Sequence, residues 1–145
     1  MAGWLLLSPP GLHAQPATPN RRLELDGSGA HVELPAGIFA KLTESTVEGW
    51  VKWSSFERYS RFFDFGKGGQ SIAVYNIETN RSVGFEVSLH DHSTLDRAIG
   101  TNVLAPDTWV HLAAVASPAG MRLYVNGSLP AVHASTNTFA TVGNS

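Results

Sequence analysis

Residues 47–53, Val-Glu-Gly-Trp-Val-Lys-Trp, constrain the fold more than any other stretch of the chain. Read in twos, one face carries Val47, Val51 and Trp53, and the opposite face carries a glutamate, a lysine and Trp50. A period of two belongs to a strand in a layered sheet, whereas an amphipathic helix repeats every 3.6 residues. The stretch therefore predicts a strand with one buried face.

Two later stretches carry the same kind of pattern. Residues 109–115 are nearly apolar on both faces, which predicts a strand that is covered on each side. Residues 121–126 alternate between apolar and polar side chains and then meet Asn126-Gly127. Asn-Gly is a strong hairpin signal, because a type I′ turn needs positive φ at both central residues.

Short stretches of this kind, separated by turn residues, recur along the chain from residue 21. Such a series is typical of an antiparallel β-sandwich or jelly roll. One helical turn is expected at residues 36–42, and nothing longer has helical period. We predict strands at residues 21–26, 30–34, 45–53, 60–66, 70–77, 82–90, 94–100, 108–116, 120–126 and 129–134. We predict that the core contains Val47, Val51, Trp53, Phe63, Phe85, Val87, Trp109, Leu112, Leu123 and Val125.

The composition excludes several classes of function. The chain has 145 residues, about one domain, with 43% hydrophobic and 15% charged residues, as a soluble globular protein has. A net charge of −2 without a basic cluster argues against binding to nucleic acid. No segment reaches the roughly 20 apolar residues of a membrane helix. The absence of cysteine excludes disulfides, thiolate catalysis and cysteine-bound zinc.

The two ends differ from the middle in composition. Residues 1–14 have a short apolar core and a small residue before a possible cut, which indicates a partial secretory signal peptide. Residues 15–20 are a proline-punctuated linker, and residues 21–145 form the domain. Residues 139–145 look like a loop that leads to a further strand, so we expect the domain to be incomplete at its C-terminal end.

Five blocks of the sequence, in order, resemble the LamG-like jellyroll domains of the concanavalin A-like lectin/glucanase superfamily. The resemblance implies two curved antiparallel sheets, export to the cell surface or beyond, and a role in binding carbohydrate or another ligand. The chain departs from the family pattern in one respect, because nothing in it matches the acidic closing strand. The five blocks are residues 23–34, 46–53, 61–66, 108–115 and 123–127.

Asp26, in Asp-Gly-Ser-Gly, has two interpretations. The resemblance implies a structural calcium near this turn and the closing strand, and calcium prefers six to eight oxygen ligands. The alternative is an Asx turn, in which the carboxylate accepts backbone N–H groups. Without the closing strand the residues favour the turn, and calcium at Asp26 remains a second expectation.

Other chemistry-bearing residues receive structural interpretations. We expect Asp64 to be a buried strut paired with Arg61 or Arg58. His90-Asp91-His92 with Asp96 is the only local cluster of metal-capable side chains, and its place at a strand end favours exposed polar residues over a zinc or copper site. Residues 66–69, Gly-Lys-Gly-Gly, lack phosphate-loop spacing and are expected to form a hairpin.

Catalysis is not expected. Retaining glycosidases need two carboxylic acids about 5–5.5 Å apart. A Glu-x-Asp-x-x-Glu strand supplies such a pair, since residues at even spacing share a face. No glutamate completes this pattern: Glu24 and Asp26 fill its first two positions, but Gly29 stands at the third. No nucleophile elbow or zinc-binding His-Glu-x-x-His sequence is present.

Binding is therefore the expected function. Trp50 and Tyr124 stand at strand positions with charged or polar neighbours, where aromatic rings can stack on sugars, and Asn126 is a polar contact at the adjacent turn. We predict a non-catalytic, secreted or cell-surface module that binds an extracellular glycan. The alternative is a structural or sensor-input domain that binds a surface protein, and a remnant of a glucanase ranks last. Apart from calcium, no cofactor is expected.

Overall fold

The chain divides into two compact units, Met1–Glu33 and Leu34–Ser145. Among the residues that the structure describes, every helix and strand lies in the second unit. The predicted signal peptide and linker lie outside the described residues, so their boundaries stay predictions. The computed structural model describes residues 21–67, 69–89 and 94–142.

Residues 21–33 of the first unit turn without forming regular structure. The predicted strands at 21–26 and 30–34 are wrong, because neither segment pairs with a described strand. Backbone N–H and C=O groups of a strand need a neighbouring strand, and sequence alternation alone does not supply one. The chain turns instead at Asp26, whose Oδ1 accepts a hydrogen bond from the Ser28 N–H at 2.8 Å.

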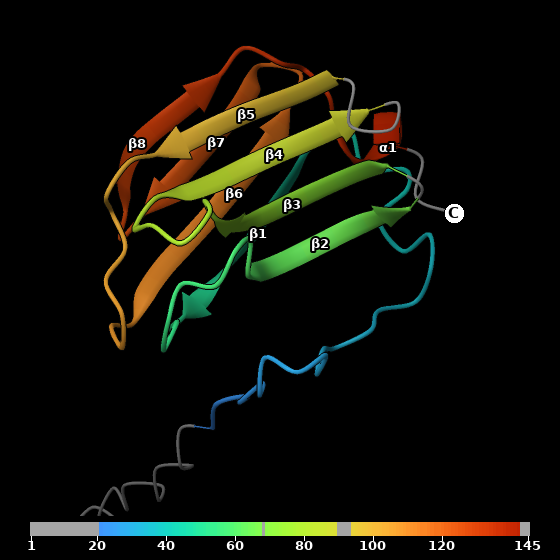
Figure 1. Ribbon diagram of the computed structural model, residues 1–145. Coiled ribbons are helices and arrows are strands. Elements are labelled where there is room, and N and C mark those ends of the chain that lie inside the picture. The colour runs from blue at the N-terminus through green and yellow to red at the C-terminus, as the bar shows by residue number, and fades with distance from the viewer. Residues whose placement is uncertain (1–20, 68, 90–93, 143–145) are drawn as a thin grey trace, which may run out of the picture. The chain divides into compact units, whose positions relative to one another are not determined.

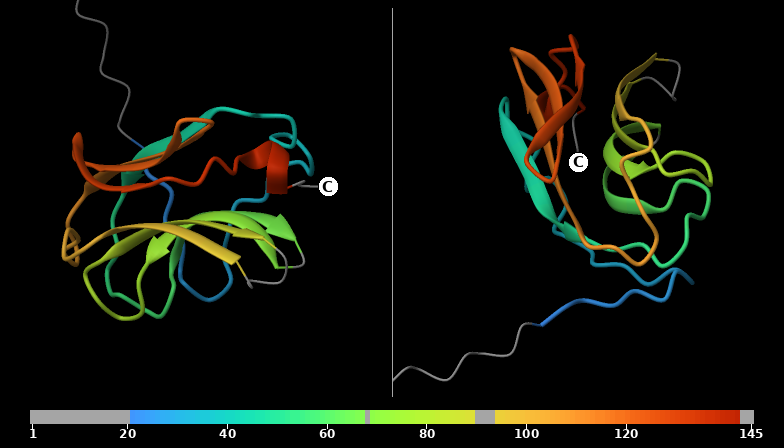
Figure 2. Two further views of the ribbon diagram at one scale, coloured as in Figure 1. Left: turned by 90° about the horizontal axis from the view of Figure 1, so that it is seen from above. Right: turned by 90° about the vertical axis from the view of Figure 1, so that its left-hand side faces the viewer.

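The second unit is an all-β sandwich of two four-stranded antiparallel sheets (Figure 1), which confirms the predicted fold class. Sheet A has the strand order β1-β6-β7-β8, and sheet B has the order β2-β3-β4-β5. The sheets face each other as two layers (Figure 2). In sheet A the strands are β1 (Ser45–Val51), β6 (Val110–Ser117), β7 (Gly120–Val125) and β8 (Ser128–His133). In sheet B they are β2 (Arg61–Lys67), β3 (Gln70–Asn76), β4 (Val83–Leu89) and β5 (Thr94–Gly100).

The core fills the space between the sheets with side chains from alternate strand positions. Phe85 and Leu112, from opposite sheets, are each 1% exposed. Val47, Val51 and Phe63 are half-buried and pack against this core. Apart from these three and Trp109, the predicted core residues are buried: Trp53, Phe85, Val87, Leu112, Leu123 and Val125.

Trp109 is the error in the predicted core. Its side chain is 45% exposed, whereas Trp53 is only 8% exposed. Val110 and Leu112 are buried in the core, so strand alternation turns Trp109 and His111 to the opposite side of the sheet. The apolar run from 109 to 115 marked a central strand, and it did not show which face each residue takes.

One end of the sandwich is closed by aromatic packing. A short helix, α1 (Phe139–Val142), brings Phe139 within 5.3 Å of Phe39 and 5.6 Å of Phe65, measured between ring centroids. The expected loop at residues 139–145 is therefore helical in its described part. The helical turn expected at 36–42 is instead a series of turns, with hydrogen bonds such as that from the Ala40 N–H to the Gly37 carbonyl.

The hairpin predicted at Asn126-Gly127 is present. Asn126 has φ 50° and Gly127 has φ 78°, and Val125 pairs with Ser128 across the turn. Both central residues thus take the left-handed backbone that a type I′ turn requires. The turn joins β7 to β8 and places Asn126 beside β6, next to the candidate site.

Candidate functional site

The side of sheet A that faces away from the core carries the candidate site. We call it the outer face of sheet A. Along β1 the exposed positions alternate with half-buried ones, so the outward residues follow from the strand period and the register with β6 and β7. The outer face comprises Thr46, Glu48, Trp50, His111, Ala113, Val115, Arg122 and Tyr124.

Trp50 is the most exposed aromatic side chain on this face, with 64% of its surface open. It lies opposite His111 in the β1–β6 register, and the two rings meet edge to face at a centroid distance of 5.4 Å. The Nε2 atom of His111 lies 3.9 Å from Oε2 of Glu48. The indole is therefore oriented by one neighbour and flanked by a carboxylate, with its remaining surface free to meet a ligand.

Trp109 extends the aromatic surface beyond the start of β6. The ammonium group of Lys52 lies 5.9 Å from the centroid of its ring, a cation–π distance. Lys52 follows β1 and Trp109 precedes β6, so both belong to the end of the sheet that carries Trp50. Sequence reasoning assigned Trp109 to the core, and only the register shows that it joins this face.

Tyr124 and Asn126 lie next to the same surface. Tyr124 is half-buried and pairs with Ala113, which pairs in turn with Glu48, so one row of side chains crosses three strands. The Oδ1 atom of Asn126 accepts a hydrogen bond from the His111 N–H at 2.9 Å, and the Asn126 N–H donates to the His111 carbonyl at 2.9 Å. Asn126 therefore anchors the β7–β8 turn to β6 at His111, the residue that pairs with Trp50.

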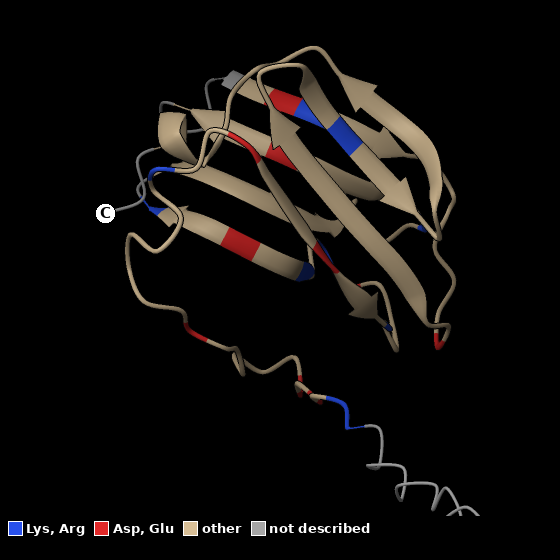
Figure 3. Ribbon diagram, turned by 180° about the vertical axis from the view of Figure 1, so that it is seen from behind, with Lys and Arg blue, Asp and Glu red and all other residues tan. Residues whose placement is uncertain are grey.

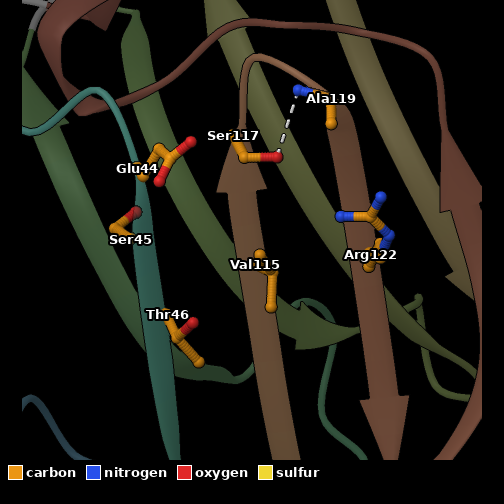
Figure 4. Close-up of a pocket in the computed structure, with 7 residues that line it drawn as sticks. All are labelled: Glu44, Ser45, Thr46, Val115, Ser117, Ala119 and Arg122. Atoms are coloured by element: carbon orange, nitrogen blue, oxygen red, sulfur yellow. Dashed lines mark hydrogen bonds between the residues drawn. The ribbon is translucent and has the colours of Figure 1, made fainter.

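An open hollow of about 540 Å³ lies at the opposite end of the outer face. Figure 4 shows Glu44 and Arg122 on its two sides, with Ser117 between them; the Ser117 Oγ accepts a hydrogen bond from the Ala119 N–H at 3.2 Å. Thr46, which lines the hollow, is four positions from Trp50 along β1. At about 3.3 Å per residue, the hollow therefore begins roughly 13 Å from Trp50. The hollow is lined by Glu44, Ser45, Thr46, Val115, Ser117, Ala119 and Arg122.

The two sheets differ in charge. Among Lys, Arg, Asp and Glu, the strands of sheet A carry Glu48 and Arg122 alone (Figure 3). An aromatic, sparsely charged surface suits a ligand with apolar faces and hydroxyl groups, or a protein surface. The strands of sheet B carry Arg61, Asp64, Lys67, Glu86, Asp96 and Arg97.

Asp26 lies in the first unit and is an incomplete fit to calcium. One of its carboxylate oxygens accepts the Ser28 N–H, as the Asx-turn interpretation expects. Calcium takes six to eight oxygens, often from several carboxylates. Over residues 21–67, 69–89 and 94–142, no group of three or more His, Asp or Glu side chains is placed to hold a metal ion. Calcium at Asp26 stays a prediction.

The remaining candidates from the sequence have structural partners or lie outside the described residues. Asp64 pairs with Arg61 at 2.5 Å and is exposed, so the expected partner is correct and the expected burial is wrong. Arg58 pairs instead with Glu78 at 2.8 Å.

The cluster of metal-capable side chains is described only at Asp96. Asp96 accepts a hydrogen bond from the side-chain amide of Asn137 at 2.8 Å. His90, Asp91 and His92 lie outside the described residues.

Sequence reasoning missed a set of polar side chains on the outer face of sheet B. Asp64, Ala73, Glu86 and Arg97 form one row across β2, β3, β4 and β5. Each lies on a different strand, so no spacing in the sequence relates them. The search for paired acids along one strand could not detect the two carboxylates of this row.

Comparison with family models supports the fold at the level of sequence. Residues 26–145 match the model of the concanavalin A-like lectin/glucanases superfamily, laminin G type. The chain belongs to this family. The match agrees with the two four-stranded antiparallel sheets of this LamG-like domain. A search of curated proteins gives no match.

The family assignment carries two broad consequences. LamG-like domains are non-catalytic binding modules, and they are typically extracellular. In the described part of the chain, no helix is both long and apolar enough to cross a bilayer.

Proposed function

We propose that the chain is a non-catalytic extracellular module that binds carbohydrate through the outer face of sheet A, with Trp50 as the main contact. The observation that carries this proposal is the 64% exposure of Trp50 beside a second exposed tryptophan, Trp109. Large aromatic side chains gathered on the surface of a soluble protein mark interaction sites.

Stacking is the physical basis of the proposed recognition. A pyranose ring presents C–H groups that pack against an aromatic face, and this contact removes apolar area from water. Glu48, Lys52 and His111 surround Trp50 with groups that can accept or donate hydrogen bonds to hydroxyls. Tyr124 supplies a second ring two strands away, and Asn126 acts by fixing the turn to His111.

The carboxylates of the described residues support a non-catalytic role. Asp64 and Glu86 share a row on sheet B, but each is held in an ion pair with an arginine, Arg61 or Arg97. The paired carboxylic acids of a glycosidase must both reach the scissile bond. Here a guanidinium group occupies one side of each carboxylate.

Export and calcium are the other parts of the proposal. We propose that residues 1–14 direct secretion, in keeping with the usual extracellular place of LamG-like domains. Calcium near Asp26 would act on stability of the turn, not on the stacking surface. Thermal unfolding measured with calcium and with a chelator therefore tests the calcium proposal, and glycan binding under the same two conditions tests the stacking surface.

The direct experiment is a glycan-array screen followed by affinity measurements on variants. Trp50→Ala and Tyr124→Ala should each weaken binding by about 0.5–1.5 kcal/mol, which is about 2- to 13-fold in Kd. Ile38→Ala is the matched control, because Ile38 is an exposed apolar residue (56%) in the turns before β1 and belongs to neither sheet. A screen without any bound glycan, with or without calcium, would contradict the carbohydrate proposal.

A protein ligand is the second candidate. The same low charge and exposed tryptophans that suit a sugar also suit the aromatic-rich centre of a protein interface. In this case the domain is a structural or sensor-input part of a surface protein. A glycan-negative result, together with a partner whose binding Trp50→Ala abolishes, would select this alternative.

A further inference from the structure

The outer face of sheet B carries a network of side chains whose chemistry differs from that of the tryptophan surface. Its centre is Glu86 on β4, flanked by Tyr75 on β3 and Arg97 on β5. Asp64 and Arg61, from β2, complete it at the side. None of these residues belongs to β1, β6, β7 or β8, so the network is independent of the site proposed above.

The carboxylate of Glu86 is buried, and the hydrogen bonds that it accepts from described residues all go to one of its two oxygens. Its side chain is 8% exposed, and Oε2 accepts hydrogen bonds from the Tyr75 hydroxyl and from Nε of Arg97 at 2.8 Å, with a further contact from the Arg97 terminal nitrogen. Within the described part of the chain, no group donates to Oε1. Buried polar atoms are nearly always hydrogen-bonded, so Oε1 is an acceptor that awaits a donor.

Two guanidinium groups border the Tyr75 ring, whose hydroxyl bonds Glu86. Those of Arg61 and Arg97 lie 5.8 Å and 6.0 Å from the centroid of the Tyr75 ring. Their side chains are 49% and 31% exposed. Nη1 of Arg61 donates to the Tyr59 carbonyl at 2.9 Å, and the N–H groups that bond neither this carbonyl nor a carboxylate are open to a ligand. Burial first, and then the hydrogen bond to Glu86, raises the pKa of Tyr75, which therefore stays a neutral donor.

The loops before β2 and after β3 each hold one residue in an unusual backbone conformation. Tyr59 has φ 58° and Glu78 has φ 50°, a region that bulky residues rarely adopt. The Tyr59 hydroxyl donates to Glu78, and the Tyr59 ring packs edge to face on Tyr75 at 5.5 Å. Strained residues of this kind cluster at ligand sites, where the surrounding contacts over-determine their conformation.

The charges of the face select the class of ligand. Arg61 and Arg97 are each balanced by a carboxylate, so neither an anion nor a cation meets a net attraction. The open positions are donors on the arginines and acceptors on Asp64 and Glu86. Hydroxyl groups both donate and accept, and neighbouring hydroxyls of a sugar can bond to both kinds of position at once.

We propose that the outer face of sheet B is a second ligand site, for the hydroxyl groups of a neutral glycan, with Glu86, Asp64 and Arg97 as the binding residues. Recognition there depends on hydrogen bonds, because the Tyr75 ring is covered by the two arginines. The chain would then bind glycan on both faces of the sandwich, by stacking on one and by polar contacts on the other.

The test is an NMR titration of the full chain carrying Trp50→Ala, which removes the main contact of the first site. Neutral glycans from an array panel, including cellohexaose and laminarihexaose, are compared with heparin as a sulfated probe. We expect a neutral glycan to shift amide signals of β3, β4 and β5. Asp64→Asn and Glu86→Gln should each weaken this binding by at least about tenfold, since hydrogen bonds to charged groups are lost.

Glu44→Gln is the control, because it makes the same carboxylate-to-amide change at an exposed position beside sheet A. Asp64→Asn, at an exposed position, keeps the test decisive if Glu86→Gln does not fold. Three results would each overturn the proposal: no shift on sheet B with any neutral glycan, equal or tighter binding of heparin, or variants that lower the melting temperature and leave the affinity unchanged. Because Trp50 is already absent, these results do not depend on whether the first site binds.

Discussion

Trp50 and His111 face each other across β1 and β6, with ring centroids 5.4 Å apart and ring planes at 62°. The contact orients the indole while 64% of the Trp50 surface stays open. The inner face of the same strands is occupied by Val51 and Val110, which pack in the core. Trp50 therefore contributes to the surface of the domain and not to its core. Removal of the Trp50 side chain should weaken binding more than it lowers stability.

The stability of two alanine variants tests this difference. Trp50→Ala should lower the free energy of unfolding by about 1 kcal/mol or less, because it removes one edge-to-face contact at an exposed position. Phe85→Ala should lower it by about 3–5 kcal/mol, because Phe85 is 1% exposed in the core. Urea denaturation measures both. A Trp50→Ala variant as unstable as Phe85→Ala would show that Trp50 is part of the core.

The Asn126 turn gives a second prediction. Asn126→Ala should destabilise the chain by about 1–2 kcal/mol, because it removes the acceptor of the His111 N–H and places alanine at φ 50°. Asn126→Gly loses the same hydrogen bond but tolerates positive φ, so its cost should be smaller. Thermal unfolding of the two variants side by side gives the order. An alanine variant as stable as the wild type would contradict the anchoring role.

The sequence predicted most of the fold. The two-residue period and the turn residues located all the strands from β1 to β8 within a few residues. The predicted strands near residues 21–34 failed because pairing depends on a partner that alternation cannot identify. Trp109 was misplaced for a related reason. An apolar run buried on both sides does not indicate which residues face inward until a neighbouring strand sets the register.

The candidate sites were partly predictable. Polar neighbours along one strand correctly marked Trp50 as an outward residue, and the Asn-Gly pair located the turn beside it. The Glu86 network could not be predicted, because Tyr75, Glu86 and Arg97 are neighbours only through the pairing of three strands. Its residues look like ordinary strand positions in the sequence.

The pKa of Glu78 should report the hydrogen bond that its carboxylate accepts from the Tyr59 hydroxyl. The hydrogen bond from Tyr59, and then those from Arg58, lower the pKa of Glu78 below 4.5. A lowered pKa in the folded state adds stability above the unfolded pKa, and this stability is lost as the pH falls below 4.5. Tyr59→Phe should move the pKa of Glu78 back toward 4.5 and make the loss of stability at acid pH shallower.

NMR titration of the Glu78 carboxyl and urea denaturation at several pH values between about 5 and 2 follow the two effects. Tyr124→Phe is the matched control, because Tyr124 lies on the other sheet. An unchanged Glu78 titration in the Tyr59→Phe variant would contradict the predicted link between the two loops.

The ion pairs of Asp64 and Glu86 predict that the protein does not hydrolyse glycans. Assays on laminarin, xylan, agar and cellulose should give no hydrolysis, because Asp64 and Glu86 are held by arginines. Turnover that disappears in Glu86→Gln or in Glu48→Gln would revive the glucanase interpretation and contradict the binding role.

The most direct measurement follows the indole N–H signals of the tryptophans during titration with a glycan selected by the array. Trp50 is 64% exposed on the proposed surface, and Trp53, three positions along the chain, is 8% exposed in the core. Binding to the outer face of sheet A should shift the Trp50 signal, together with that of Trp109, and leave the Trp53 signal in place. A glycan that binds while the Trp50 signal stays unchanged would contradict the proposed site.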